Sequence, residues 1–540
     1  MSDAAPRELS LEVLAARLTA LESERDAART ERDEYKRLYV ALLEGYRKLE
    51  AGLVGQKRER FVGSAEQGVL PDLLKMLVPS TPTPSVTTEV PAHTRSRPTG
   101  RKPLPEKLPR IEVQVVPLEV QKAGLDAYEC IGVDESETVE RRPASIVVVR
   151  TIRPKYVAKE KLANLAVGES TPVLQAPALE LPIPRGLAGP GLLADTIVKR
   201  WQDHLPLHRM ERIYGRDGLP LARSTICGWH EAVAGLTAPL VEAMFDDARR
   251  TAPYLCTDAT GVLVQDIEKC RRAHFFVVVA PGKHVLFRYT TTHDAKAVDR
   301  VLCDYRGFLV ADAHSVYEHL YEDGTVIEVA CWAHARRYVF KSLETDGPRA
   351  RHALSLIQAL FKLEREYAKD PPEEKLRRRQ LEAKPIVDAF FRWCDEESLK
   401  VLDETPISKA IGYARNQREA LQRFLTDGRL PIHNNHSENA LRREALGRRN
   451  WLFVGNDDGG ETNATLVTLL ASCQLHNLEP LGYLRDLLCL LPGWPQTRVL
   501  ELAPAYWAKT LESPAVREKL EANVFRQAAL GTREPTPKPT

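Results

Sequence analysis

Three acidic residues, far apart in the sequence, lie where a metal-dependent nuclease needs carboxylates. Asp258 interrupts one apolar, strand-like run, Asp312 ends another, and Glu438 opens a helix-like segment rich in arginine. Mg²⁺ prefers carboxylate oxygens and keeps several waters, so three carboxylates suffice for two ions. Two such ions about 4 Å apart can activate an oxygen nucleophile and stabilise the leaving oxygen of a phosphodiester. We therefore predict that Asp258, Asp312 and Glu438 are catalytic metal ligands, with Asp258 bridging two Mg²⁺ ions that Mn²⁺ can replace.

The elements around these acids are predicted to bring them together. Strands are expected near 254–265, 274–280, 284–290, 307–312 and 325–331, and helices near 294–304, 315–320 and 333–343. Three strands in hairpin order followed by alternating helix and strand describe the start of an RNase H-like fold, an α/β architecture whose first and fourth strands are neighbours. Asp258 and Asp312 would then lie within metal-bridging reach. The competing acids Asp266, Asp294 and Asp304 do not end a buried strand, but any of these acids could instead be an ordinary turn or capping residue.

Arginines follow the third acid closely. Arg442, Arg443, Arg448 and Arg449 suit bidentate contacts to DNA phosphates, although a solvated basic helix face is an equal alternative. Trp451 follows them and could stack on a base, but burial in the apolar run 451–454 is the favoured prediction.

A second cluster surrounds Cys331 and His334. Two ligands do not make a structural zinc site, so we expect His334 to pack near the active centre or to contact DNA together with Arg336 and Arg337. The equal alternative is that Cys331 is simply a buried core residue and that His334 is hydrogen-bonded within the protein.

The bulk composition is that of a globular protein of three or more domains, with 540 residues, 43% of them hydrophobic and 28% charged. The net charge of +2 gives no global argument for nucleic acid. Nine cysteines without a CxxC pair favour a reducing compartment, and no leader or membrane span is evident. We expect a cytoplasmic protein without a membrane partner.

The N-terminal part is predicted to be elongated. Residues 1–55 form a helix with heptad spacing, which favours a self-associating coiled coil over a single helix docked on its own body. Residues 56–110 are predicted to be a proline-rich linker whose basic residues are more typical of a solvated segment than of a DNA contact.

The remaining segments are predicted as successive modules. Residues 111–170 form a small β module, and 171–250 are helical, with Ser224 and Thr225 capping the last helix. The helix–glycine turn–helix pattern fits a helix-turn-helix DNA reader and a helical packing subdomain equally well. The catalytic core would span 251–475 with a charged helical insertion at about 344–430, followed by a C-terminal segment at 476–510 and a tail at 511–540.

These motifs together resemble bacterial transposases of the insertion sequence 66 family, over nearly the whole chain. The resemblance rests on Arg153–Tyr156, Asp203–Arg209, Thr257–Thr260, Gly307–Tyr317, Cys331–Arg337, Asn434–Ala440, Gly447–Phe453 and Leu478–Leu484. It implies a DDE transposase that binds the terminal inverted repeats of its element, exposes 3′-hydroxyl ends and joins them to target DNA. It also implies a bacterial protein that is nucleoid-associated when bound to DNA, a homo-oligomer built through the coiled coil, and element-encoded helper proteins. We predict in addition that Cys331, His334 and Asn435 support the active site.

One departure from the family pattern concerns zinc. The family carries a zinc module near 125–165 built on paired cysteines, but here only Cys130 stands in that region. Since one cysteine cannot hold tetrahedral zinc, we predict a zinc-free β module. This loss is the one feature that favours a decayed, non-catalytic DNA-binding derivative. A nuclease of the same fold without end recognition is disfavoured by the separate upstream segments.

Overall fold

The computed structural model describes residues 104–142, 145–159, 173–267 and 269–533, together with Thr19, Ser23, Arg25 and Asp26. The chain divides into two compact units, one of 1–103 with Lys400–Lys409 and one of Leu104–Leu399 with Ala410–Thr540. In the first unit the four described N-terminal residues are helical. The rest of the predicted coiled coil and nearly all of the predicted linker lie outside the described residues. The following paragraphs concern the second unit.

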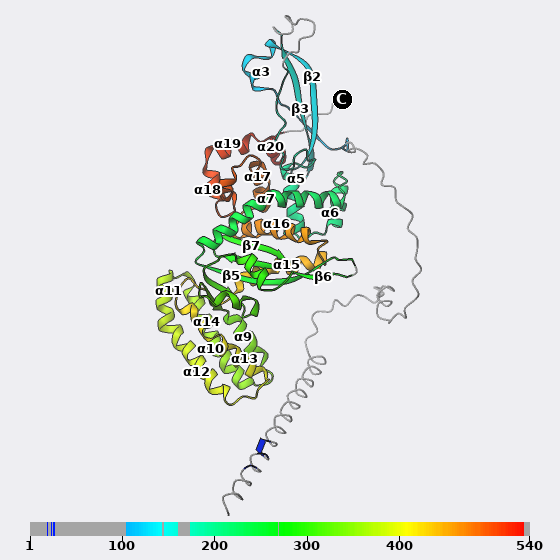
Figure 1. Ribbon diagram of the computed structural model, residues 1–540. Helices are drawn as coiled ribbons and strands as arrows, with labels where there is room; N and C mark the ends of the chain where they lie inside the picture. The colour runs from blue at the N-terminus through cyan, green and yellow to red at the C-terminus, as the bar shows by residue number, and fades with distance from the viewer. Residues whose placement is uncertain are drawn as a thin grey trace, which may run out of the picture. The chain divides into compact units, whose positions relative to one another are not determined.

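A five-stranded mixed sheet forms the centre of this unit (Figure 1). Its strands are β5 (Tyr254–Val264), β6 (Arg271–Ala280), β7 (His284–Thr290), β8 (Gly307–Ala311) and β9 (Val326–Ala330), in the order β7-β6-β5-β8-β9. The first three strands pair antiparallel, whereas β8 pairs parallel with both β5 and β9. The helices in this segment are α8 (Ala295–Leu302), the 3-10 helix η3 (Ser315–Tyr321) and α9 (Trp332–Lys341). The predicted order of strands and helices from 254 to 343 is therefore confirmed.

Two helices complete the layer beside β7. Helix α16 (Asp457–Leu475) packs along β7, and the long helix α7 (Arg223–Thr251) packs on α16. The hydroxyl of Thr468 accepts the backbone N–H of Phe287 at 2.8 Å, and the hydroxyl of Ser472 accepts that of Val285 at 3.1 Å. Because β7 is the outer strand, these hydroxyls satisfy backbone groups that would otherwise offer an edge for another chain.

A helical segment lies between α9 and α15 (Asn435–Trp451). It contains α10 (Gly347–Glu366), η4 (Tyr367–Lys369), α11 (Pro372–Arg378), η5 (Arg379–Ala383), α12 (Lys384–Ser398), α13 (Pro406–Asn416), α14 (Arg418–Gln422) and η6 (Arg423–Leu425). After it, α15 returns to the sheet and packs against β5 and β6.

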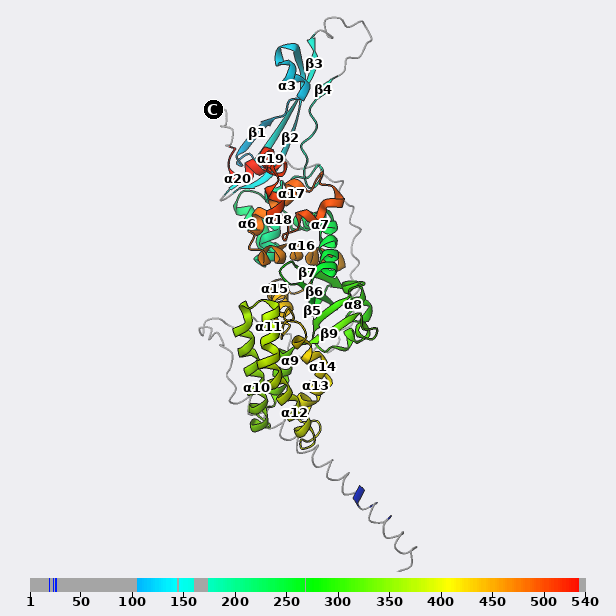
Figure 2. The same cartoon turned by 90° about the vertical axis from the view of Figure 1, so that its left-hand side faces the viewer.

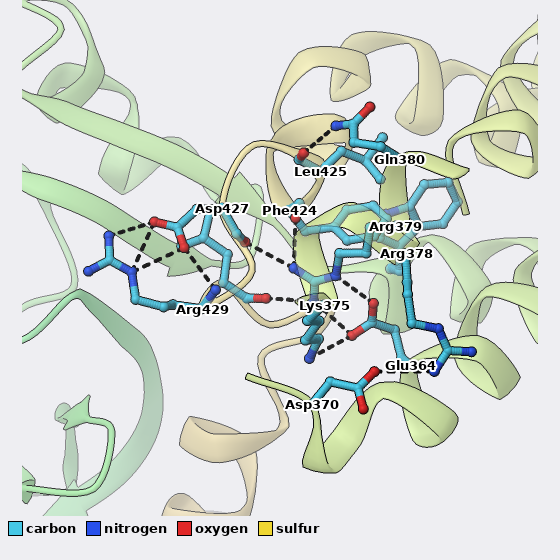
Figure 3. A network of polar contacts seen from close by, with 12 residues as sticks. Glu364, Asp370, Lys375, Arg378, Arg379, Gln380, Phe424, Leu425, Asp427 and Arg429 are labelled. Atoms are coloured by element: carbon cyan, nitrogen blue, oxygen red, sulfur yellow. Dashed lines mark hydrogen bonds and ion pairs between the residues drawn. The ribbon is translucent and has the colours of Figure 1, made fainter. Parts of the chain in front are cut away.

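Residues 375–379 form a basic run, and its last member, Arg379, is used internally (Figure 3). Arg379 is fully buried and donates one hydrogen bond to each carboxylate oxygen of Glu364, both at 2.7 Å. It also donates to the backbone carbonyls of Phe424, Asp427 and Leu430. One side chain thus fastens α10 to the chain that leads into α15.

A second sheet precedes the central one (Figure 2). It consists of β1 (Arg110–Gln114), β2 (Tyr128–Arg142), β3 (Ser145–Ala158) and β4 (Leu174–Gln175), with α3 (Leu118–Ala123) and η1 (Leu125–Ala127) before β2. Strand β3 lies between β1, which is parallel to it, and β2, which is antiparallel. The segment predicted as a small β module thus contains a sheet, and its longest strand is the 15-residue β2, which no apolar alternation in the sequence predicts.

The C-terminal segment is folded where the sequence predicted a tail from residue 511. Its helices are α17 (Pro480–Leu490), η7 (Gln496–Leu502), α18 (Trp507–Glu512), α19 (Pro514–Ala522) and α20 (Val524–Leu530). Phe525 and Ala528 of α20 share an apolar core with Ile111, Val147 and Val149 of the second sheet. The C-terminal helix is therefore part of the β module's core.

Between the two sheets the chain is helical, as predicted. It forms α5 (Pro190–Ile197), the π-helical turn η2 (Val198–Gln202), α6 (Leu207–Arg216) and then α7. The predicted cap of α7 is wrong, because the helix begins at Arg223 after Ala222 and so contains Ser224 and Thr225 in its first turn. Within the described ranges, no helix is long and apolar enough to span a bilayer.

Candidate active site

The sheet register brings the first two acids together. Cys256 of β5 pairs with Val310 of β8, the last pair of that parallel ladder. Asp258 and Asp312 each follow two residues later in the chain. Asp312 follows directly after β8, so the register places the two acids near each other where the ladder ends, and the charge of Asp312 helps to raise the pKa of Asp258.

Asn434 connects the third acid to the same place. Its buried side-chain amide donates to the carbonyl of Thr257 at 2.8 Å, one residue before Asp258. Its backbone N–H donates to the thiol sulfur of Cys331 at 3.2 Å, directly after β9. Asn434 is also the N-cap residue of α15, so the start of this helix is held against the interior of β5 and the end of β9.

Glu438 lies in the first turn of α15, one helical turn after Asn434. One of its oxygens lies 3.4 Å from Nη2 of Arg337 and 3.6 Å from Nε2 of His334. Burial and the neighbouring Arg337 lower the pKa of His334, so its imidazole is neutral near pH 7. Helix α9 therefore supplies one cation and one neutral ring beside Glu438.

The electrostatics of Asp258 reflect this convergence. Burial raises the pKa of the Asp258 carboxyl to about 7, and the charges of Asp312 and Glu438 contribute in the same direction. The backbone N–H of Ala259 and the charge of Arg337 act in the opposite direction. Like charges that oppose ionisation at a shared site are typical of carboxylates that bind a cation.

The donor set fits Mg²⁺ in kind, since it offers three carboxylates on rigid elements. Across the described residues, however, no three histidine, cysteine or acidic side chains stand close enough together to hold a metal ion as they are placed. The three carboxylates would therefore have to draw closer together when Mg²⁺ binds. The side-chain oxygen of Asn434 is buried and lacks a hydrogen-bond partner among the residues described, so the site also holds one unused acceptor.

The predicted supporting residues have different environments. Cys331 is fully buried and accepts the hydrogen bond from Asn434, while His334 is adjacent to Glu438. Asn435, in contrast, is half-buried, and its backbone N–H bonds to His433. Asn434 was not predicted as a site residue, although the pair Asn434-Asn435 directly before a helix was a signal for an N-cap residue.

The six candidate DNA-contacting arginines fall into two groups. Arg336, Arg337, Arg442 and Arg449 are exposed. Arg443 donates to the side chains of Gln202 and Gln474, and Arg448 donates to the carbonyl of Gly261. The exposed group remains a prediction for phosphate contact, whereas the other two arginines fasten α15 to its neighbours.

The apolar run after α15 is not the buried segment that the sequence predicted. Trp451 is half-buried, Leu452 is 65% exposed and Phe453 is 41% exposed, and only Val454 belongs to the core. The run is held at the surface because Val454 pairs with the end of β5.

The comparisons with known proteins agree with one another. Residues 185–462 match the family described as "Transposase IS66 family", and residues 41–113 match the one described as "Transposase C of IS166 homeodomain". The uncharacterized protein y4hP of Sinorhizobium fredii (strain NBRC 101917 / NGR234) is 28% identical over 507 residues, which cover 87% of this chain and 89% of that protein. The uncharacterized protein y4qI of the same organism is 31% identical over 427 residues, 75% of this chain and 77% of that protein.

The first match covers more than half of the chain and includes all three acids. The α/β core that the matched residues form is therefore that of a transposase family. The chain belongs to the IS66 transposase family.

Proposed function

We propose that this protein is a DDE-type DNA transposase that binds the terminal inverted repeats of its element and catalyses metal-dependent cleavage and strand transfer. The observation that carries the proposal is the convergence at Asn434, which ties the start of Glu438's helix to the strand of Asp258 and to the end of β9. The charges of Asp312 and Glu438, which add to the raised pKa of Asp258, support the same assignment.

We also propose that the central sheet is an RNase H-like core. Its strand order β7-β6-β5-β8-β9 has three antiparallel strands followed by two parallel ones, which matches the arrangement expected from the sequence. In this assignment the insertion is the helical segment from α10 to α14, and the β module and the helices before α7 serve DNA binding.

The roles of the residues follow from their positions. Two bound Mg²⁺ or Mn²⁺ ions would supply an activated oxygen nucleophile and stabilise the leaving oxygen. Asp258, Asp312 and Glu438 would hold them, and the exposed arginines Arg442 and Arg449 would orient the DNA backbone. His334 and Arg337 position the Glu438 carboxylate through their contacts with it.

The proposed partners are the terminal repeats and target DNA, with a second copy of the chain joined through the N-terminal helix and with helper proteins of the element. A zinc-free β module belongs to the same proposal, since Cys130 is exposed on β2 and is its one cysteine. Metal analysis of the purified protein that finds zinc bound to residues 111–170 would refute this part.

The alternative is a decayed derivative that binds ends without catalysis. A strand-transfer assay separates the two, using labelled duplexes of the terminal repeats flanking the gene and scrambled duplexes as controls. If the protein is an active transposase, joined product should form with Mg²⁺. No product should form with EDTA or from ends that carry a 3′-dideoxy nucleotide. Specific end binding without product, with helper proteins present, would favour the decayed derivative.

A further inference from the structure

A pocket lies at the far end of α15, away from Glu438. It encloses about 260 Å³ between Trp451 and Phe453, the turn η2 with Arg200 and Trp201, and the start of α16. The guanidinium carbon of Arg200 lies 4.6 Å from the ring centre of Trp201 and 5.6 Å from that of Trp451. The walls therefore combine flat aromatic faces with a cation.

Two hydrogen-bond donors without a partner belong to residues that line the pocket. Trp201 is 8% exposed, and its indole Nε1 is buried. Neither this nitrogen nor Nη1 of Arg200 meets an acceptor among the described side chains and backbone. A buried donor without a partner is unfavourable, so a small rotation of either side chain toward a ligand that brings an acceptor would be stabilising. Glu231 at the pocket adds an acceptor for an amino group.

The chain beside the pocket is strained and apolar. Leu452 has a φ of +65°, a conformation that a leucine rarely adopts, and its side chain is exposed next to that of Phe453. Two backbone bonds of 2.8 Å hold this geometry, from Val454 N–H to the Leu263 carbonyl and from Gln265 N–H to the Val454 carbonyl. Strain maintained at an exposed apolar turn is typical of a functional loop.

Resting on the proposed DNA transposase function, we propose that this pocket binds one unstacked nucleobase of the DNA end. The base has a flat π-face for Trp451 and ring acceptors for the buried donors, and the apolar side chain of Leu452 is placed to fill the gap left in the stack. Thirteen residues of helix separate Glu438 from Trp451, about 20 Å at 1.5 Å per residue. At about 3.4 Å per nucleotide, the base lies within about six nucleotides of the cleaved bond.

The test is a double-mutant cycle between protein and DNA. Dissociation constants are measured for the terminal-repeat duplex and for a series with a single abasic nucleotide at each of the positions nearest the cleavage site. The proteins are wild type, Trp451→Ala, Trp451→Phe and Leu399→Ala, the last removing an 89% exposed leucine at the end of α12.

At one position the abasic nucleotide should weaken binding to wild type about tenfold, in line with the loss of one base–aromatic stack. Trp451→Ala should show the same loss on the intact duplex and no further loss on the abasic one. Trp451→Phe should retain most of the coupling, and Leu399→Ala should behave like wild type.

The two proposals fail in different ways. If wild type prefers the terminal repeat over scrambled DNA but no position couples to Trp451, the base-binding pocket is wrong, whereas the proposed recognition of the terminal repeats stands. If wild type shows no preference for the terminal repeat, both proposals fall. A Trp451→Ala variant that has lost binding to all DNA, scrambled duplex included, counts against a base-specific role.

Discussion

Asp258 has the environment that most clearly separates a functional carboxylate from a structural one. Its pKa is raised to about 7, first by burial and then by the charges of Asp312 and Glu438, and the contact from Ala259 only partly offsets this. A carboxyl with a folded pKa above its ordinary value contributes stability at low pH that is lost as the pH rises through the folded pKa. The metal-free site should therefore destabilise the protein near neutral pH.

Replacing this carboxyl tests that consequence. In EDTA at pH 8, Asp258→Asn should be more stable than wild type by about 1–3 kcal/mol, since raising a pKa by one pH unit corresponds to about 1.4 kcal/mol. At pH 4 the two proteins should melt alike. Adding Mg²⁺ at pH 8 should stabilise wild type but not the variant, and the wild-type gain should shrink below pH 7 as Asp258 becomes protonated. Equal melting temperatures at pH 8 in EDTA would contradict the assigned environment.

At the scale of elements, a buried group of ion pairs around Glu364 fastens the helical segment from α10 to α14. Glu364 is nearly buried and is neutralised by Arg379 and Lys375, which hold its pKa low against the effect of burial. Removing one partner of a buried pair leaves the other charge buried without compensation. In addition, the ring of Phe361 on α10 stacks on His433, the residue before Asn434. The segment thus supports the start of α15.

Arg379→Ala should cost about 3–5 kcal/mol of unfolding free energy. The matched control is Arg377→Ala, which breaks an exposed pair with Glu374 and should leave the unfolding free energy nearly unchanged, since water screens that pair. Urea unfolding of both variants measures the difference. If both variants lost similarly little unfolding free energy, the network in Figure 3 would not be what fastens the α10–α14 segment.

The carboxylate of Glu140 joins the β module to helix α5. Oε1 of Glu140 on β2 accepts the backbone N–H of Leu192 in α5 and that of Arg141, both at 2.7 Å. Oε2 is buried and finds no donor among the described groups. Burial raises the pKa of Glu140 from 4.5 to about 8, so its stabilising effect is complete below the ordinary value and is lost as the pH rises through 8.

Glu140→Gln keeps an acceptor for both N–H groups and removes the charge. It should match wild type at pH 5 and be the more stable protein at pH 8.5. Glu137 on the same strand is the control. Its burial alone would raise its pKa, but bonds from Arg110 and Arg150 lower it overall, so Glu137→Gln should lose stability at pH 8.5. Thermal melts over this pH range would contradict the account if both variants shifted in the same direction.

At the scale of the whole chain, the sequence predicts the central sheet better than the modules around it. The strands of that sheet are apolar runs bounded by turns, so their order follows directly from the pattern. Strand β2 was missed because its residues are mostly polar and half-exposed, and α20 was missed because its apolar residues pack on strands about 400 positions earlier. The roles of Arg443 and Arg448 depend on partners far along the chain, which no local pattern reveals.

The most direct measurement of the central claim is strand transfer in Mg²⁺ by six single acid variants, each normalised to its binding of the terminal repeat. Asp258→Asn, Asp312→Asn and Glu438→Gln should lose joined product at least about a hundredfold while retaining end binding, because each removes a metal ligand. Asp266→Asn, Asp294→Asn and Asp304→Asn, the competing acids of the same sheet region, should remain within a few-fold of wild type. Retained strand transfer in any of the first three, or an equal loss in a competitor, would contradict the assignment of the catalytic acids.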